Sequence, residues 1–324
     1  MPGQLSYPYP GDVGRSPCNP LYPAPGLYAI SATNLQGLWL AGGDVFVHFR
    51  SQEPVAQIGH SILVYEVPAT ATGQANPTCI SGLDLGDLDT ESIGRSFGRG
   101  LGWIKWFDHH ASFILPGSGD AVYVLPSPPL EFASDWQDVF HSRAVVLHTQ
   151  SEIDEQPAAT VYVLDRAAVE AIMEDVLASL EEPMPLVAVP AVFDHSLEFL
   201  GYRLLSPEGV SPGQDLELGT VWRVTAEMPP AMGDLQMFVH LLDAEGQWRG
   251  GQDRLDLEPL AWEAGDVLLQ YHRLNVPGDA VAGKYQVTLG LYVRHTMERL
   301  SIYDNAGQSV GDRLLLRWID VDTP

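Results

Sequence analysis

The stretch Gln236-Met237-Phe238-Val239-His240-Leu241-Leu242 has the length and composition of a β-strand, and it belongs to a series that fills the last part of the chain. Turn sequences such as Ser211-Pro212-Gly213 and Pro277-Gly278-Asp279 separate the members of this series. The members are residues 198–204, 216–224, 236–242, 268–274, 285–292, 299–303 and 314–321. Short strands at this spacing predict an antiparallel β-sandwich over residues 188–324.

A mixed unit precedes the predicted sandwich. Strand-like runs occupy residues 102–107, 111–115, 121–125, 143–148 and 160–164. A helix is predicted over residues 166–182, because Asp165 provides an N-cap, apolar residues recur on one stripe that includes Ile172, and Pro183 ends the pattern. A polar linker at residues 68–78 opens this part of the chain, so we expect a central mixed α/β unit over residues 68–187.

The first 67 residues have the pattern of a small α/β unit. A Pro-Gly turn at residues 25–26 leads into an apolar strand, and Ser31 stands where a helix takes its cap. A second strand is predicted over residues 61–67. The fold class that the sequence predicts is therefore α+β and mostly β: a small N-terminal α/β unit (1–67), a central mixed α/β unit (68–187) and a C-terminal antiparallel β-sandwich (188–324).

Composition limits the classes of partner. The 324-residue chain is 45% hydrophobic and carries a formal net charge of −25. This composition indicates a folded, acidic protein that repels nucleic acid. No apolar run is long enough for a membrane helix, and Met1-Pro2-Gly3-Gln4 does not begin a signal peptide. Cys18 and Cys79 lie in Pro-containing turns, and the sequence leaves open whether they form a disulfide or stay as two thiols.

No residue pattern marks a catalytic centre. Asp108-His109-His110 is the one place where titratable residues cluster as a metal-ligand set does. Adjacent histidines on a strand point to opposite faces, so we interpret this segment as a polar turn between two strands. We predict no catalytic residue and no metal site. A structural calcium ion in the sandwich is the one cofactor left open, with oxygen donors from Gln252, Asp253, Asp256 and Asp266.

Trp248 is the best candidate for an exposed tryptophan, because it lies in the Gly-rich segment Gly246-Gln247-Trp248-Arg249-Gly250-Gly251. We interpret residues 246–253 as a loop. An exposed indole suits the apolar face of a sugar ring. The sequence therefore predicts a carbohydrate-binding loop in which Trp248 stacks on the sugar, while Arg249, Gln252 and Asp253 bind its hydroxyl groups.

Two parts of the chain resemble a known family. The N-terminal part carries Gly26-Leu-Tyr-Ala-Ile-Ser-Ala-Thr-Asn-Leu-Gln-Gly, then Phe49-Arg50, Glu53-Pro-Val-Ala and Ile58-Gly-x-Ser-Ile-x-Val-Tyr. This order resembles the soluble tail of bacterial integral-membrane glycosyltransferases (GT-C type) that use polyprenyl-phosphate sugars. In the predicted sandwich, Phe238–Asp243, Gln252-Asp253, Gly283-x-Tyr285, Gly290-Leu-Tyr292 and Arg299-Leu300 are similar to the accessory β-sandwich at the C-terminus of the same proteins.

The resemblance implies a non-catalytic, extracytoplasmic region of a membrane glycosyltransferase-like protein that positions glycan or acceptor. Its implied partners are a glycan or lipid-linked sugar and a membrane glycosyltransferase core, and its implied location is extracytoplasmic or at the cell surface, reached through a segment outside this chain. Glycosyltransferase activity would need that core, so no catalytic residue is carried over. Two alternatives stay open. One is a free-standing extracellular glycan-binding or adhesion protein, and the other is a hydrolase with a site between the α/β unit and the sandwich.

Overall fold

A computed structural model describes residues 26–36, 46–50, 52–67, 77–83, 87–88, 104–127, 136–152, 157–181, 191–206, 209–226, 234–304 and 306–322. The chain divides into two compact units. The first unit comprises Met1–Phe107, Gly119–Glu131 and Trp136–Ala168, and the second comprises Asp108–Ser118, Phe132–Asp135 and Val169–Pro324. The described residues are mostly β-strand, which confirms the predicted fold class.

A three-stranded antiparallel sheet begins the first unit. Its strands are β1 (Gly26–Ser31), β2 (Ala56–Ile58) and β3 (Ile62–Val67), in the order β1-β3-β2. The hydroxyl of Ser31 accepts a hydrogen bond from the N–H of Asn34 at 3.0 Å, so Ser31 caps the short helix α1 (Ala32–Leu35) as predicted. A second short helix, α2 (Val47–Arg50), contributes Phe49, whose ring packs against Tyr28 and Tyr65.

A five-stranded mixed sheet also lies among the described residues of the first unit. Its strands are β4 (Thr78–Ile80), β5 (Ile104–Trp106), β7 (Ala121–Pro126), β8 (Val145–Gln150) and β9 (Ala159–Leu164), in the order β5-β4-β7-β9-β8. The helix α4 (Trp136–Arg143) was not predicted, because its eight residues hold only three apolar ones, Trp136, Val139 and Phe140, which is too short a run to indicate a helix. Cys79 is buried in β4, and Cys18 lies outside the described residues.

The helix α5 (Arg166–Ala178) confirms the predicted helix and its cap. The carboxylate of Asp165 accepts a hydrogen bond from the N–H of Ala168 at 2.7 Å. Val169, Ile172 and Val176 are buried, as their spacing on one stripe predicts. The helix ends four residues before the predicted end. No helix in the described ranges is both long and apolar enough to cross a membrane.

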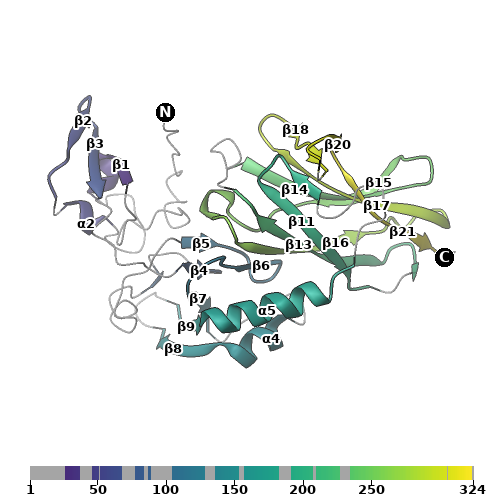
Figure 1. Cartoon of the computed structure of the whole chain (residues 1–324), viewed down its shortest axis with the longest axis horizontal. Coiled ribbons are helices and arrows are strands. Elements are labelled where there is room, and N and C mark those ends of the chain that lie inside the picture. The colour runs from purple at the N-terminus through teal and green to yellow at the C-terminus, as the bar shows by residue number, and fades with distance from the viewer. Residues whose placement is uncertain are drawn as a thin grey trace. The chain divides into compact units, whose positions relative to one another are not determined.

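The second unit holds two facing sheets (Figure 1). One is antiparallel, with the strand order β20-β19-β10-β11-β13-β16-β6. Its strands are β6 (Ser112–Leu115), β10 (Ala191–Phe193), β11 (Leu197–Leu204), β13 (Asp215–Val224), β16 (Val267–Asn275), β19 (Ile302–Tyr303) and β20 (Ser309–Gly311). The inner side of this sheet carries a large aromatic cluster, in which the buried indole of Trp222 contacts the rings of Phe193 and Phe199 edge-on.

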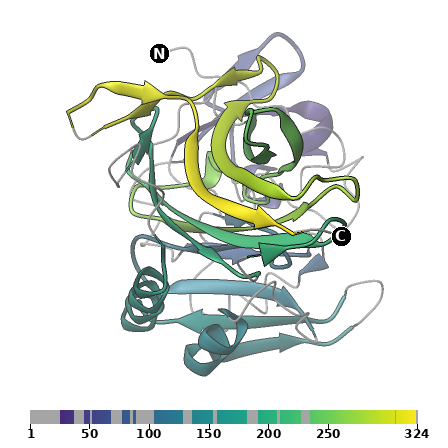
Figure 2. The same cartoon turned by 90° about the vertical axis from the view of Figure 1, so that its right-hand side faces the viewer.

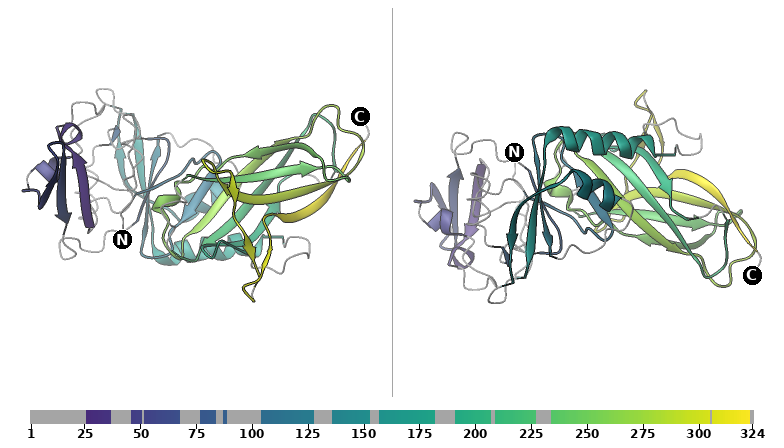
Figure 3. Two further views of the ribbon diagram at one scale, coloured as in Figure 1. Left: turned by 90° about the horizontal axis from the view of Figure 1, so that it is seen from above. Right: turned by 90° about the horizontal axis from the view of Figure 1, so that it is seen from below.

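The other sheet of the second unit has the order β12-β21-β17-β14-β15, with β18 paired to the end of β17. Its strands are β12 (Gly209–Val210), β14 (Leu235–Leu242), β15 (Trp248–Asp253), β17 (Gly283–Val293), β18 (Glu298–Arg299) and β21 (Leu314–Val321). Figure 2 shows β21 (yellow) curving beside β17, and both views of Figure 3 show the long strands running side by side. The pairs are antiparallel except β12 with β21.

One strand of the second unit comes from the middle of the chain. Ser112–Leu115 form β6, which pairs with β16 at the edge of the seven-stranded sheet. The predicted boundaries place this segment in the central unit (68–187), whereas the structure groups it with the sandwich strands that follow residue 188. The physical reason is that β16 would otherwise leave its backbone groups unpaired along one side.

Candidate functional site

The segment around Trp248 is a strand, not the predicted loop. A turn closed by Asp243 leads into β15, which pairs with β14 and forms the edge of its sheet. The carboxylate of Asp243 accepts hydrogen bonds from the N–H groups of Glu245 and Gln247 and from Arg249. The adjacent glycines Gly250 and Gly251 led to the prediction of a loop, because glycine has a low strand propensity. Pairing with β14 outweighs that low propensity.

Strand register defines which side chains of β14 and β15 share a face. Met237 points inward, since its sulfur lies 3.7 Å from the hydroxyl of Thr220 on the facing sheet. Alternation then places Phe238 and His240 on the outer face. Their partners on β15 are Asp253 and Gly251, and Trp248 continues the outer row beyond a bulge.

The centre of this outer face is a hydrogen-bonded carboxylate. Asp253 accepts from His240 Nε2 at 2.9 Å through Oδ1 and from the hydroxyl of Tyr292 at 3.0 Å through Oδ2. Burial, together with the hydrogen bond to Asp253, raises the pKa of the Tyr292 phenol. The three groups come from three neighbouring strands, β15, β14 and β17, so the sheet itself holds them in place.

Aromatic rings continue the face on both sides of this carboxylate. The Trp248 indole is 62% exposed and meets the His240 ring edge-on, with centroids 6.5 Å apart. The His240 ring lies 4.6 Å from that of Phe238, and the Arg299 guanidinium lies 4.8 Å above the Phe238 ring. We call this set the outer platform: Phe238, His240, Trp248, Asp253, Tyr292 and Arg299.

Glycines make room for the rings of the outer platform. A Cβ atom at Gly251 would lie 2.6 Å from Cδ2 of His240, and a Cβ atom at Gly290 would collide with the ring of Phe238. Both positions stand directly opposite those rings in the strand register. The two rings therefore lie flat across neighbouring strands instead of standing away from the sheet.

Only two of the four predicted sugar-binding residues share this face. Trp248 and Asp253 belong to the outer platform. The guanidinium of Arg249 is held by Asp243 at 2.7 Å, and these contacts raise the pKa of Arg249. Gln252 alternates to the other side, where its side-chain oxygen accepts from the N–H of Arg273.

The four other members of the outer platform were missed at the sequence level. Phe238, His240 and Tyr292 lie in strands whose other face is core, so strand alternation is the signal that points them outward. Arg299 reaches the platform because β18 pairs beside Tyr292, which is a pairing that alternation alone does not predict.

The four proposed calcium donors are each engaged by different protein groups. Asp256 is bound by Arg254 and Gln270, and Asp266 accepts from the N–H groups of Gly117 and Glu263. Asp253 and Gln252 have the partners described above. Within the described residues, the three aspartates among them are not brought together as one ligand set.

Asp108–His110 form the predicted polar turn, just before β6. The carbonyl of Asp108 accepts from the N–H groups of Ala111 and Ser112. The two histidines do not point to opposite faces as expected for a strand, because the turn brings the rings of His109 and His110 to a centroid distance of 4.1 Å. Burial, and then the neighbouring His110, lower the pKa of His109.

Comparisons with known proteins add little. No protein family matches the sequence, and no curated protein is significantly similar to it. A mutant β-glucosidase from Listeria innocua in complex with laminaribiose is similar over 39% of this chain, with 14% identity and a TM-score of 0.24, and this chain spans 16% of that enzyme. AvmM, described as catalysing macrocyclisation in alchivemycin A biosynthesis, is similar over 43% of this chain and 92% of its own, with 12% identity and a TM-score of 0.20. TM-scores this low support no conclusion about fold or function.

Proposed function

We propose that this protein is a non-catalytic carbohydrate-binding protein that recognises neutral glycans through the outer platform. The observation that carries the proposal is the pairing of an exposed indole with a fixed polar group: Trp248 is 62% exposed beside His240, and His240 is hydrogen-bonded to Asp253. A pyranose ring has an apolar face and a rim of hydroxyl groups, so it needs both kinds of contact. Binding sites generally combine apolar surface with a few well-placed polar groups.

The polar groups of the outer platform suit hydroxyl recognition. The side chain of Asp253 is 43% exposed and remains an acceptor beyond its bonds to His240 and Tyr292. Arg299 supplies donors beside the Phe238 ring, and its contact with Asp312 at 3.4 Å is long for a hydrogen bond. A face that offers both acceptors and donors matches a hydroxyl group, which needs one of each.

Charge favours neutral over acidic glycans. The chain has a formal net charge of −25, and the outer platform contributes one carboxylate and one guanidinium. Long-range repulsion disfavours polyanionic ligands. The proposal therefore excludes highly sulfated or phosphorylated polysaccharides as preferred ligands.

The resemblance to polyprenyl-phosphate-sugar glycosyltransferases supports a cellular location and a partner for this glycan binding. On that basis the protein acts outside the cytoplasm beside a membrane glycosyltransferase core and holds a glycan product or acceptor near it. The chain itself would supply the binding and the partner the chemistry. A free-standing extracellular glycan-binding protein would use the same platform, and genomic context separates these two versions.

The test begins with a glycan array that includes undecaprenyl-linked saccharides. The purified chain is then titrated with neutral oligosaccharides, and calorimetry measures the affinity. One contact site of this kind predicts weak binding, near the millimolar range, where about 4 kcal/mol is available. Trp248→Ala should abolish the binding. Val281→Ala is the matched control, because Val281 is an exposed apolar residue of the same unit outside the platform. Equal affinity in wild type and Trp248→Ala would overturn the proposal.

A further inference from the structure

The turn at Asp108–His110 is a second cluster of chemically active side chains, and the outer platform does not use it. One ligand atom from each of the three side chains lies within 4.8 Å of the other two. The histidine rings face each other at a centroid distance of 4.1 Å with an interplanar angle of 36°. We propose that this turn binds one divalent transition-metal ion of the zinc class through Asp108, His109 and His110.

The donor types select the class of metal. Two imidazoles and one carboxylate suit zinc, nickel, cobalt or copper, whereas calcium and magnesium prefer oxygen ligands throughout. Three protein ligands leave at least one coordination position for water or another small ligand. The site is thus of the open kind, with His110 and part of Asp108 accessible to solvent.

The geometry needs a small adjustment on binding. Metal–ligand bonds of about 2.0–2.2 Å place tetrahedral ligand atoms roughly 3.3 Å apart, which is closer than the 4.8 Å limit of this cluster. His109 is buried and supplies a fixed ligand, while His110 is exposed and rotates at little cost. The ligand atoms therefore come closer together through rotation of the Asp108 and His110 side chains, and the backbone of the turn does not change.

A second set of contacts orients the Asp108 carboxylate. Its Oδ1 accepts from the N–H of His110 at 3.0 Å, and its Oδ2 pairs with Arg254 at 3.1 Å. Asp256 also binds Arg254, at 2.6 Å, so two carboxylates offset the one guanidinium. Ligating carboxylates are commonly held by such outer hydrogen bonds. The net charge of −25 adds a favourable field for a cation.

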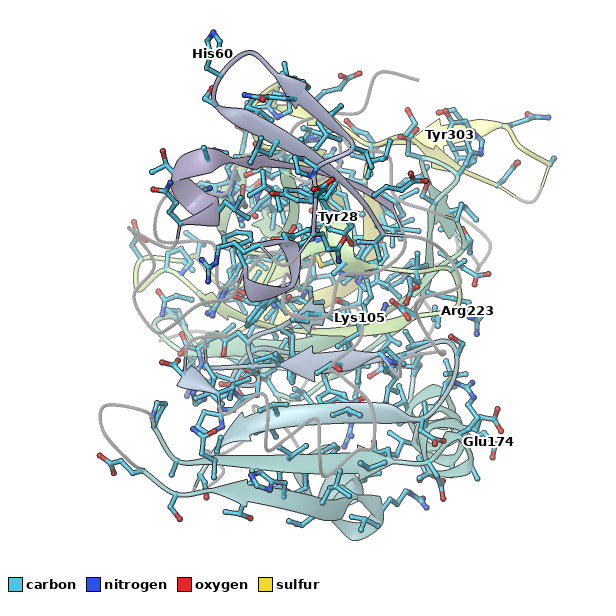
Figure 4. All side chains as sticks on the ribbon, turned by 90° about the vertical axis from the view of Figure 1, so that its left-hand side faces the viewer. Tyr28, His60, Lys105, Glu174, Arg223 and Tyr303 are labelled. Carbon is cyan, nitrogen blue, oxygen red and sulfur yellow. The ribbon has the colours of Figure 1, made fainter. Side chains whose placement is uncertain are left out.

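The experiment is calorimetric titration of the tag-free full chain with zinc chloride in a buffer that does not chelate metals. We expect saturable one-to-one binding and a higher melting temperature with zinc. His110→Ala should weaken binding about tenfold or more, and its exposed position keeps the fold intact. His60→Ala is the matched control, because His60 projects from the turn between β2 and β3 into solvent (Figure 4).

Two further readouts sharpen the result. Cobalt should give a visible absorption spectrum that His110→Ala loses and His60→Ala keeps. Trp248→Ala should bind zinc as wild type does, which separates this site from the carbohydrate proposal. The inference is overturned if zinc binds without one-to-one stoichiometry, if His110→Ala binds as tightly as wild type, or if calcium binds in preference to zinc.

Discussion

Oδ1 of Asp253 lies 2.9 Å from Nε2 of His240, and this contact joins the edge strand β15 to its neighbour β14 on the outer face of the sheet. The second oxygen of the same carboxylate accepts from Tyr292 on β17. Asp253 therefore orients two ring side chains at once. If the outer platform binds glycan, this carboxylate holds the polar centre of the platform in the geometry that a sugar hydroxyl meets.

Asp253→Asn should weaken glycan affinity about tenfold, which corresponds to about 1.4 kcal/mol. An amide keeps the size of the side chain but replaces one acceptor oxygen with a donor, so one of the two groups that donate to Asp253 would have to accept instead. Calorimetric titration measures the effect. Tyr292→Phe is the companion variant, because it removes one partner and leaves the carboxylate. Unchanged affinity in both variants would show that the carboxylate serves the fold alone.

Gly251→Ala should displace the His240 ring and destabilise the protein by about 1–3 kcal/mol. The added Cβ would lie 2.6 Å from Cδ2 of His240 and 2.7 Å from the carbonyl oxygen of Val239. Urea denaturation measures the loss, and glycan titration should show weaker binding. Gly219→Ala is the matched control, since Gly219 is also a strand glycine but has nothing within 4 Å of the added Cβ. Similar stabilities of the two variants would contradict the close packing inferred at position 251.

Stability should fall as the pH is lowered, because of His272. Burial, and then the nearby Arg254, lower the pKa of this fully buried imidazole to about 3, from 6.5 in the unfolded chain. Between these values the unfolded chain binds a proton that the folded chain does not, so acid favours unfolding. The expected contribution is about 3 kcal/mol between pH 7 and pH 4, and it vanishes above pH 6.5.

The check is urea denaturation at pH 7 and pH 4 for wild type, His272→Gln and His60→Gln. His272→Gln should be less stable at pH 7, since the ring nitrogen contacts the Thr220 hydroxyl at 3.1 Å, yet it should lose less stability on acidification. His60→Gln should keep the pH dependence of wild type, because His60 is exposed. An identical loss between the two pH values in wild type and His272→Gln would refute the assignment.

Gln270→Leu should destabilise the protein by about 2–4 kcal/mol, because it leaves buried groups without hydrogen bonds. The amide nitrogen of Gln270 donates to Asp256 at 2.7 Å and to the carbonyl of Ala111 at 3.1 Å, beside the start of β6. Its oxygen accepts from the N–H of Asp256. Thermal unfolding followed by circular dichroism measures the change, and a melting temperature equal to that of wild type would show that these bonds are dispensable.

Local sequence patterns predicted most elements of the fold. Period-two runs with turn signals found β13, β14 and β17, and the caps at Ser31 and Asp165 placed two helix starts. These features depend on residues close together in the chain. The pairing of β6 with β16 joins segments about 150 residues apart, and no local pattern encodes it.

The candidate site was predictable only in part. Trp248 and Asp253 were predicted from their residue types. The strand that aligns them was not predicted, because Gly250 and Gly251 gave the segment the composition of a loop. Register then decides which side chains meet: it sends Gln252 to the far side and brings His240 into the centre. The same limit applies to His109 and His110, whose proximity follows from a turn and not from strand alternation.

The most direct measurement of the central proposal is a ¹⁵N-resolved NMR titration of the tryptophan indole groups with a neutral oligosaccharide. The signal of Trp248, assigned by its absence in Trp248→Phe, should shift with saturation, because this indole is 62% exposed on the outer platform. The signals of the buried Trp106, Trp222 and Trp262 should stay in place. A glycan that binds without moving the Trp248 signal, or a panel of neutral glycans that moves no indole signal, would contradict glycan binding by the outer platform.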